Sequence, residues 1–148
     1  MPSYRHRMGY GFQVTVDSSS PHTLAKWWAA ALGWRVEPSN EDFIRGLVAA
    51  GHAREEDTEI FEGVLVWKAG AAISDPEVPA RPRVLFQLVP EGKTVKNRLH
   101  FDIRAGEDRE ALAGRLAEAG ATVLHRGRQG PNEWITMSDP EGNEFCVA

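Results

Sequence analysis

The sequence contains a single cysteine, Cys146, and no long hydrophobic run. A lone cysteine cannot form an internal disulfide, which favours a reducing compartment. No segment approaches the roughly 20 apolar residues that are needed to cross a bilayer. The first residues include basic side chains but no apolar stretch typical of a signal peptide. We therefore expect a cytoplasmic protein without a membrane partner.

Positively charged residues are also outnumbered. The sequence has 17 lysines and arginines and 21 aspartates and glutamates, for a net charge of −4. This balance argues against nucleic acid as a partner. The sequence also has no nucleophile elbow, phosphate-binding loop, dinucleotide fingerprint or paired-cysteine metal motif. These absences argue against acyl-enzyme hydrolysis and nucleotide-driven chemistry.

What the sequence does contain is an internal repeat. Apolar and polar residues alternate in FQVTVD, which predicts a strand at 12–17. Apolar residues then recur at helical spacing and predict a helix at 21–33. The same order returns as a strand at 99–103 and a helix at 107–120. The chain therefore repeats one strand–helix plan in nearly the same register.

Local signals set the ends of the predicted helices. Ser20 can cap the first helix, and Pro21 suits its first position because proline has no N–H to lose there. Gly33 and Gly120 can adopt the left-handed conformation that ends a helix. Further extended segments complete each half, at 34–38, 64–68, 83–89, 121–125, 133–137 and 144–148.

The fold class expected from this order is α+β, with tandem βαβββ modules. With 148 residues, of which 42% are hydrophobic, the chain suits one domain, 1–148. Module one covers about 10–89 and carries a helical insertion near 39–62. PEGKTVKN, residues 90–97, forms a linker, and module two covers about 98–148.

The stretch KNRLHFDI carries polar residues at every second position. On a strand, successive side chains point to opposite faces. Leu99, Phe101 and Ile103 would therefore share one face. The other face would carry charged residues around a histidine, namely Arg98, His100, Asp102 and Arg104.

The duplicated plan, together with LAKWWAAALGW, KNRLHFDI and DPEGNEFCV, resembles the vicinal oxygen chelate superfamily. That superfamily includes glyoxalase I, bleomycin-resistance proteins and extradiol dioxygenases, and the last two stretches resemble its bacterial glyoxalase-like domain proteins. The resemblance implies two curved mixed sheets that enclose a cleft, helices on the outside, and a homodimer. It also implies that His100 faces the cleft, while Leu99, Phe101 and Ile103 pack outward against a helix.

The resemblance further implies a site for one divalent metal ion (Zn, Ni, Mn or Fe). Its ligands would be Gln13, His100 and Glu144, with Gln87 as a weak fourth, and Glu144 would be the best candidate for a catalytic base. Many dioxygenase relatives have histidine where Gln13 stands, which disfavours extradiol dioxygenase chemistry. A structural role competes with each assignment. His100 would hydrogen-bond to Asp102 or to a neighbouring strand, and Gln13 would bond to its neighbour on the strand. Glu144 would be a solvated carboxylate beside DPEGN, residues 139–143, which is predicted to form a hairpin turn.

Candidate substrate-binding residues follow from residue type. Arg98 can bind a carboxylate or phosphate through charge-assisted hydrogen bonds, and Asp102 shares its face. Aromatic side chains suit the wall of a cleft for a flat ligand. Cys146 is either a nucleophile or a small residue that fills a strand position. The aromatic candidates are Trp67, Phe86 and Trp134.

Three functions are compatible with these features. The first is a metal-dependent lyase or isomerase that uses His100, Glu144 and Gln13. The second is a non-catalytic protein that binds a drug or metabolite, like the bleomycin-resistance relatives. The third is an accessory dimerisation domain without activity. The sequence leaves the enzyme and the binding protein nearly equal, and it does not identify the ligand.

Overall fold

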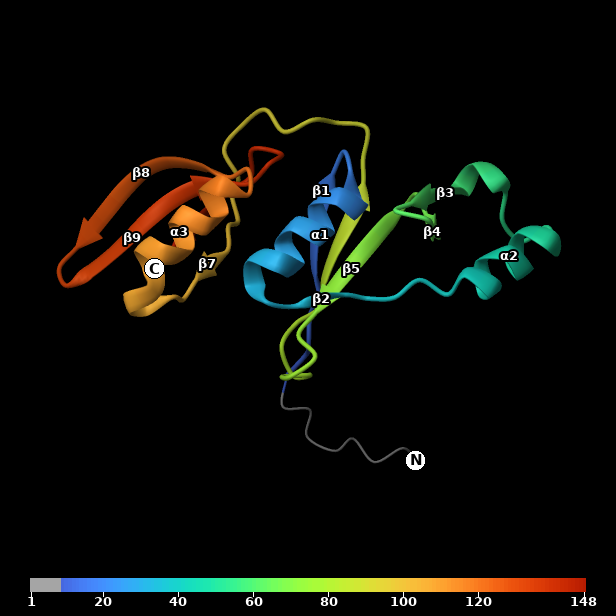
Figure 1. Ribbon diagram of the computed structural model, residues 1–148, viewed down its shortest axis with the longest axis horizontal. Coiled ribbons are helices and arrows are strands. Elements are labelled where there is room, and N and C mark those ends of the chain that lie inside the picture. The colour runs from blue at the N-terminus through green and yellow to red at the C-terminus, as the bar shows by residue number, and fades with distance from the viewer. Residues whose placement is uncertain (1–8) are drawn as a thin grey trace.

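The structure, a computed structural model, describes residues 9–148. Its first half forms a four-stranded sheet with the strand order β1-β6-β5-β2, covered by helix α1. Strands β1 and β6 are parallel, and the other neighbours in this sheet are antiparallel. We call this half module one (Figure 1). Its elements are β1 (Val14–Ser18), α1 (Pro21–Leu32), β2 (Arg35–Val36), β5 (Gly70–Ser74) and β6 (Val84–Leu88).

The second half, module two, repeats this arrangement. Its sheet has the strand order β7-β10-β9-β8, again with one parallel pair, β7 and β10, and helix α3 packs on it. The elements are β7 (Asp102–Ile103), α3 (Arg109–Glu118), β8 (Thr122–Gln129), β9 (Asn132–Ser138) and β10 (Glu144–Val147). The prediction of an α+β fold with two repeated modules is therefore confirmed.

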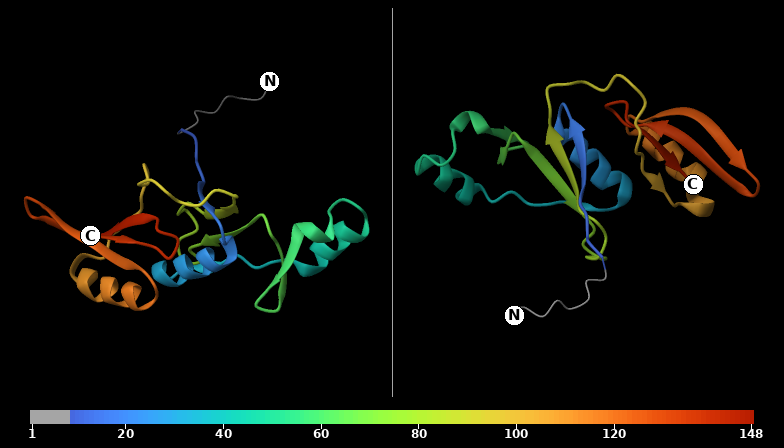
Figure 2. Two further views of the ribbon diagram at one scale, coloured as in Figure 1. Left: turned by 90° about the horizontal axis from the view of Figure 1, so that it is seen from above. Right: turned by 180° about the vertical axis from the view of Figure 1, so that it is seen from behind.

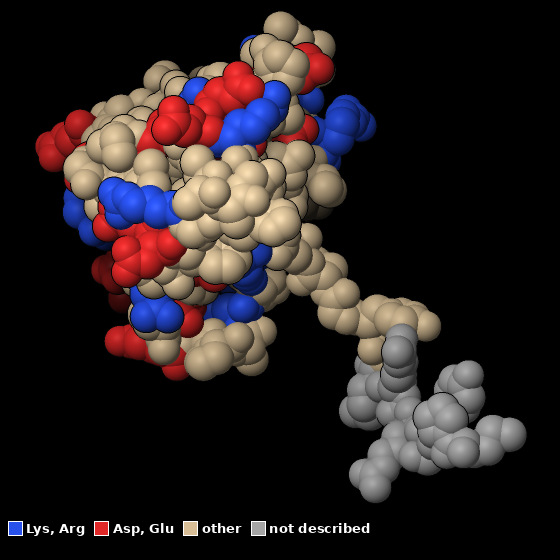
Figure 3. All heavy atoms as spheres, turned by 90° about the vertical axis from the view of Figure 1, so that its right-hand side faces the viewer, with Lys and Arg blue, Asp and Glu red and all other residues tan. Residues whose placement is uncertain are grey.

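Between β2 and β5, module one carries an insertion that runs on to Trp67, past the expected bounds of 39–62. It consists of helix α2 (Glu41–Ala49), a 3₁₀ turn at Glu55–Asp57 and a hairpin of β3 (Thr58–Phe61) and β4 (Val64–Trp67). The Asn40 side chain caps α2 by accepting a hydrogen bond from the Phe43 N–H at 3.0 Å. On the face that carries this insertion, acidic and basic side chains are interspersed, and neither sign dominates (Figure 3).

Helix α1 begins and ends where the sequence predicts. Pro21 occupies its first turn, and Gly33 ends it with a left-handed φ of 68°. The apolar stripe of α1 supplies Leu24 and Trp28 to the core, both 2% exposed. The helix is therefore held by burial of one face rather than by a side-chain cap, because Ser20 forms no capping hydrogen bond.

One hydrophobic core runs through both modules. Helices α1 and α3 lie on the same side of the two sheets (Figure 2), and their buried residues belong to one cluster with residues of β6, β9 and β10. The Trp28 ring lies between the modules, in edge-to-face contact with Phe101 and Phe145 of module two. The two halves therefore share one core and form a single packed unit. None of the helices among residues 9–148 is long and apolar enough to span a bilayer.

Two strand predictions are wrong in detail. Pairing at the expected strand 99–103 is confined to Asp102–Ile103, and Leu99 is 89% exposed instead of packing against a helix. Without a neighbouring strand, the alternation of faces does not hold at Leu99. The third strand of the module-one sheet is β5, whose sequence GAAIS lacks the usual strand formers, whereas the predicted strand 64–68 pairs with β3 outside this sheet.

Candidate functional site

A cleft of about 900 Å³ lies between the modules. We call it the inter-module cleft. One wall is β1, and the other is the segment from the linker to Phe101, which passes over the top in yellow in Figure 1. Trp28, Phe101 and Phe145 give it an apolar floor, since all three line it and belong to or contact the core. Polar side chains at its rim are Thr15, Asp17, Lys93, Asn97, Arg98 and His100.

The DPEGN turn, residues 139–143, joins the modules beside this cleft. The Glu141 carboxylate accepts hydrogen bonds from the Ser18 hydroxyl at 2.6 Å and from the Ser19 N–H at 2.9 Å, both on module one. Asp139 is 4% exposed and accepts a hydrogen bond from the Trp28 indole N–H at 3.0 Å. The turn was predicted as a hairpin turn only, and its second role is to hold β1 and α1 against module two.

Glu144 lines the cleft, and each of its carboxylate oxygens accepts a hydrogen bond. Lys93 donates to one oxygen at 3.0 Å, and the Asn97 backbone N–H donates to the other, also at 3.0 Å. Burial alone would raise the pKa of Glu144, but the hydrogen bonds from Asn97 and Lys93 outweigh it and lower the pKa to about 2. Through these hydrogen bonds, the Glu144 carboxylate ties the linker to β10.

This pKa makes stability depend on pH. The pKa of an unfolded glutamate is about 4.3, so the Glu144 contribution is complete above that pH and is lost as the pH falls towards 2. We expect Glu144→Gln to lower the free energy of unfolding by on the order of 2 kcal/mol at pH 7 and by little at pH 2. Urea denaturation at both pH values measures this. Glu91→Gln is the matched control, since Glu91 is exposed on the same cleft; an equal loss in both variants would contradict the role of Glu144.

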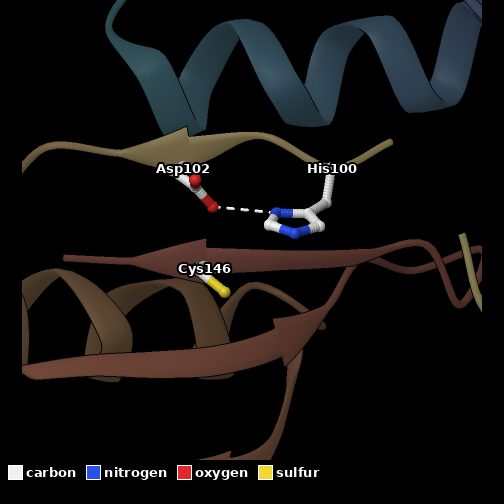
Figure 4. A group of neighbouring side chains, drawn as sticks. All are labelled: His100, Asp102 and Cys146. Atoms are coloured by element: carbon white, nitrogen blue, oxygen red, sulfur yellow. Dashed lines mark hydrogen bonds and ion pairs between the residues drawn. The ribbon is translucent and has the colours of Figure 1, made fainter. Parts of the chain in front are cut away.

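His100 also lines the cleft, and its side chain lies beside those of Asp102 and Cys146 (Figure 4). The His100 Nδ1 and an Asp102 carboxylate oxygen lie 2.8 Å apart. One potential ligand atom from each of the three residues lies within 4.8 Å of the other two. Among residues 9–148 this is the one group of three or more such side chains that could hold a metal ion. We call it the His–Asp–Cys cluster.

The structure does not gather the four predicted ligands in one place. His100 and Glu144 line the inter-module cleft, whereas Gln87 lines a second hollow of about 830 Å³ on module one. Gln13 is exposed, and its amide oxygen accepts a hydrogen bond from Arg83 at 2.8 Å. The donors that do come together are the imidazole, carboxylate and thiol of the His–Asp–Cys cluster, a set that fits a divalent ion such as Zn²⁺.

The candidate substrate-binding residues are likewise divided. Arg98 lines the inter-module cleft, and Trp67 lines the module-one hollow, where its backbone carbonyl contacts the His22 Nε2 at 2.7 Å. Phe86 is completely buried in the core. Trp134 is half-buried on β9 and covers Gly127, where an added Cβ would lie 2.1 Å from the indole ring. Of these residues, Arg98 is the one that lines the inter-module cleft.

Sequence reasoning missed Lys93, Asn97 and Asp139. The contacts of Lys93 and Asn97 with Glu144 join residues 51 and 47 positions apart, so no local pattern indicates them. Asp139 was noticed only as part of a turn. For Cys146 the sequence did carry a signal. Glu144 and Cys146 alternate onto one face of the last strand, and this places the thiol on the side that carries polar groups.

Residues 13–148 match the family model described as a glyoxalase-like domain. The chain belongs to this glyoxalase-like domain family. The match covers all elements of both modules, and it confirms the predicted relationship to the vicinal oxygen chelate superfamily. No curated protein matches this glyoxalase-like chain in sequence.

Solved structures agree with the family at the level of the fold. The fosfomycin resistance protein FosX from Mesorhizobium loti has a TM-score of 0.59 and 11% identity, over 96% of this chain and 91% of its own. A FosX mutant from Listeria monocytogenes, in complex with Mn(II) and dihydroxypropylphosphonic acid, has a TM-score of 0.62 and 8% identity, over 96% and 92%. A possible glyoxalase from Bacillus cereus has a TM-score of 0.58 and 12% identity, over 95% and 98%.

Proposed function

We propose that this glyoxalase-like protein binds a small organic molecule in the inter-module cleft and that Glu144 takes no part as a catalytic base. The observation that carries the proposal is the cleft itself, about 900 Å³ with an apolar floor and a polar rim. Ligand pockets in proteins have volumes of roughly 300–1,000 Å³ and combine apolar walls with a few polar groups. The cleft fits this description.

The lining favours a flat ligand with an anionic end. Phe101 is partly exposed and offers an aromatic ring to a planar molecule, whereas Trp28 and Phe145, 2% and 1% exposed, close the bottom of the cleft. At the rim, Arg98 is exposed and makes no ion pair with any residue of the described part of the chain. Its guanidinium is therefore available to bind a carboxylate with two parallel hydrogen bonds. Lys93, by contrast, is already paired with Glu144.

A metal-dependent lyase or isomerase is the second candidate. The observation that favours it is the position of His100, which lines the cleft and also belongs to the His–Asp–Cys cluster. A bound ion there could polarise a carbonyl of a molecule in the cleft. Glu144 is poorly suited to accept a proton as a general base, because one of its oxygens accepts a hydrogen bond from Lys93 and the other accepts one from Asn97. The FosX mutant complex with Mn(II) is consistent with a metal in this fold.

The homodimer remains a prediction of the resemblance. Large apolar side chains are exposed at the starts of both modules, with Phe12 77% exposed and Leu99 89% exposed. A second copy that covered them would bury apolar surface. The accessory dimerisation domain remains a third candidate on the same grounds.

A thermal-shift screen in the presence of a chelator tests the proposal. We expect naphthoic, quinoline-carboxylic and related aromatic acids to include compounds that raise the melting temperature by several degrees, because binding to the folded state stabilises it. Thr15→Trp places an indole in the cleft, since Thr15 lines it from β1. This variant should lose the shift. Thr122→Trp is the matched control, at an exposed strand position outside the cleft, and it should keep the shift.

Two results would contradict the proposal. In the first, ligands raise the melting temperature only when a metal ion is added, which would favour the metal-dependent candidate. In the second, Thr15→Trp responds to the same compounds as fully as Thr122→Trp does, which would place the binding site elsewhere.

A further inference from the structure

We infer that His100, Asp102 and Cys146 form a binding site for a thiolate-preferring transition-metal ion of the Zn²⁺ class. This site deepens the metal-dependent candidate function, which places an ion at the same cluster. It does not depend on ligand binding in the cleft, because that binding is tested in chelator. The inference comes from the one place in the described chain where three potential metal ligands of different chemistry meet.

Strand pairing brings the three side chains together. In the parallel pair of β7 and β10, Asp102 and Cys146 are partners in register, so their side chains point to the same face of the sheet. His100 precedes Asp102 by two residues and points to that face too, as Figure 4 shows. The Cys146 N–H donates to the Phe101 carbonyl at 2.9 Å, which holds the thiol-bearing strand beside the imidazole-bearing segment. The backbone therefore fixes the relative positions of the ligands.

The side chains are already close to the spacing that a metal needs. Ligand atoms around a tetrahedral Zn²⁺ lie about 3.5 Å apart, given Zn–N and Zn–S bonds of about 2.0 and 2.3 Å. Here the three ligand atoms lie within 4.8 Å of one another. His100 and Asp102 are exposed, with 38% and 57% of their side chains accessible, so small rotations can close the remaining gap. An ion can also reach the site directly from solvent.

The donor types decide which metal the site prefers. A thiolate favours softer ions such as Zn²⁺, Co²⁺ and Cd²⁺, whereas Mg²⁺, Ca²⁺ and Mn²⁺ prefer oxygen ligands. Three protein ligands leave one tetrahedral position for water or another molecule. Cys146 is half-buried, and its Sγ lies 3.5 Å from the Thr136 hydroxyl, so the thiol has a polar neighbour rather than a purely apolar one.

Cobalt titration tests the inference, because Cys146 is the only cysteine in the chain. We expect Co²⁺ added to chelator-treated protein to produce a thiolate-to-cobalt charge-transfer band that saturates at one equivalent and disappears when Zn²⁺ is added. Cys146→Ser should abolish the band, and His100→Ala should weaken Co²⁺ binding at least tenfold. His52→Ala is the matched control, since His52 is exposed on the insertion, and it should bind Co²⁺ like the unaltered protein.

A second measurement needs no variant. Zn²⁺ should slow the reaction of the Cys146 thiol with a thiol reagent in the unaltered protein, and Mg²⁺ should not. The inference is overturned if no charge-transfer band forms at millimolar Co²⁺, if His100→Ala binds Co²⁺ as tightly as His52→Ala does, or if Zn²⁺ leaves thiol reactivity unchanged.

Discussion

Replacing Trp28 by alanine is expected to lower the free energy of unfolding by about 4 kcal/mol. The indole is 2% exposed, and its ring centroid lies 5.3 Å from that of Phe101 and 4.9 Å from that of Phe145. Removing it leaves a cavity between the modules and removes the edge-to-face contacts with Phe101 and Phe145. Because these contacts join α1 to module two, the loss weakens the shared core rather than one module alone.

Urea denaturation followed by circular dichroism measures this change. Trp134→Ala is the comparison, because Trp134 is a tryptophan of β9 that is only half-buried, and its replacement should cost less than half as much. Trp28→Phe keeps an aromatic ring and removes the indole N–H, so it should cost about 1–2 kcal/mol. A loss below 1 kcal/mol in Trp28→Ala would mean that Trp28 does not hold the modules together.

The second large effect is expected at Asp139. Its carboxylate is almost completely buried and accepts hydrogen bonds from the backbone N–H groups of Glu141 and Asn143, both at 2.9 Å, and from the Trp28 indole. Asp139→Ala leaves these donors without their acceptor, at a cost of about 1 kcal/mol or more each. We expect a total loss of about 3 kcal/mol.

A double-mutant cycle separates the bond between the modules from the bonds within the turn. Trp28→Phe already removes the N–H that Asp139 accepts, so Asp139→Ala should cost about 1 kcal/mol less in that background. Asp75→Ala is the control, since Asp75 is a second buried aspartate, paired with Arg81 within module one. Its effect should be unchanged by Trp28→Phe. Full additivity between Trp28 and Asp139 would show that their hydrogen bond contributes nothing.

Local sequence signals predicted the parts of the fold that depend on local chemistry. The bounds of α1 followed from Pro21 and Gly33. The repeat itself predicted two similar sheets. Strand β5 was not predicted, because glycine and alanine have low strand propensity. Its position in the sheet is set by its pairing with β2 and β6.

The candidate site was only partly predictable for the same reason. The proximity of His100 and Asp102 follows from their two-residue spacing, and it was weighed as an alternative to metal binding. That Cys146 joins them depends on the register between β7 and β10, which are 40 residues apart in the chain and carry no local mark of their pairing. The hydrogen bond from Lys93 to Glu144 depends on the path of the linker, and no periodic pattern in the sequence predicts that path.

The most direct test of ligand binding between the modules is chemical-shift mapping by NMR with an aromatic acid that stabilises the protein. We expect the largest perturbations at β1, residues 14–18, and in the segment 93–101, because these form the two walls of the inter-module cleft. Perturbations confined to β5, β6 and the β3–β4 hairpin would place the ligand in the module-one hollow and would contradict the account.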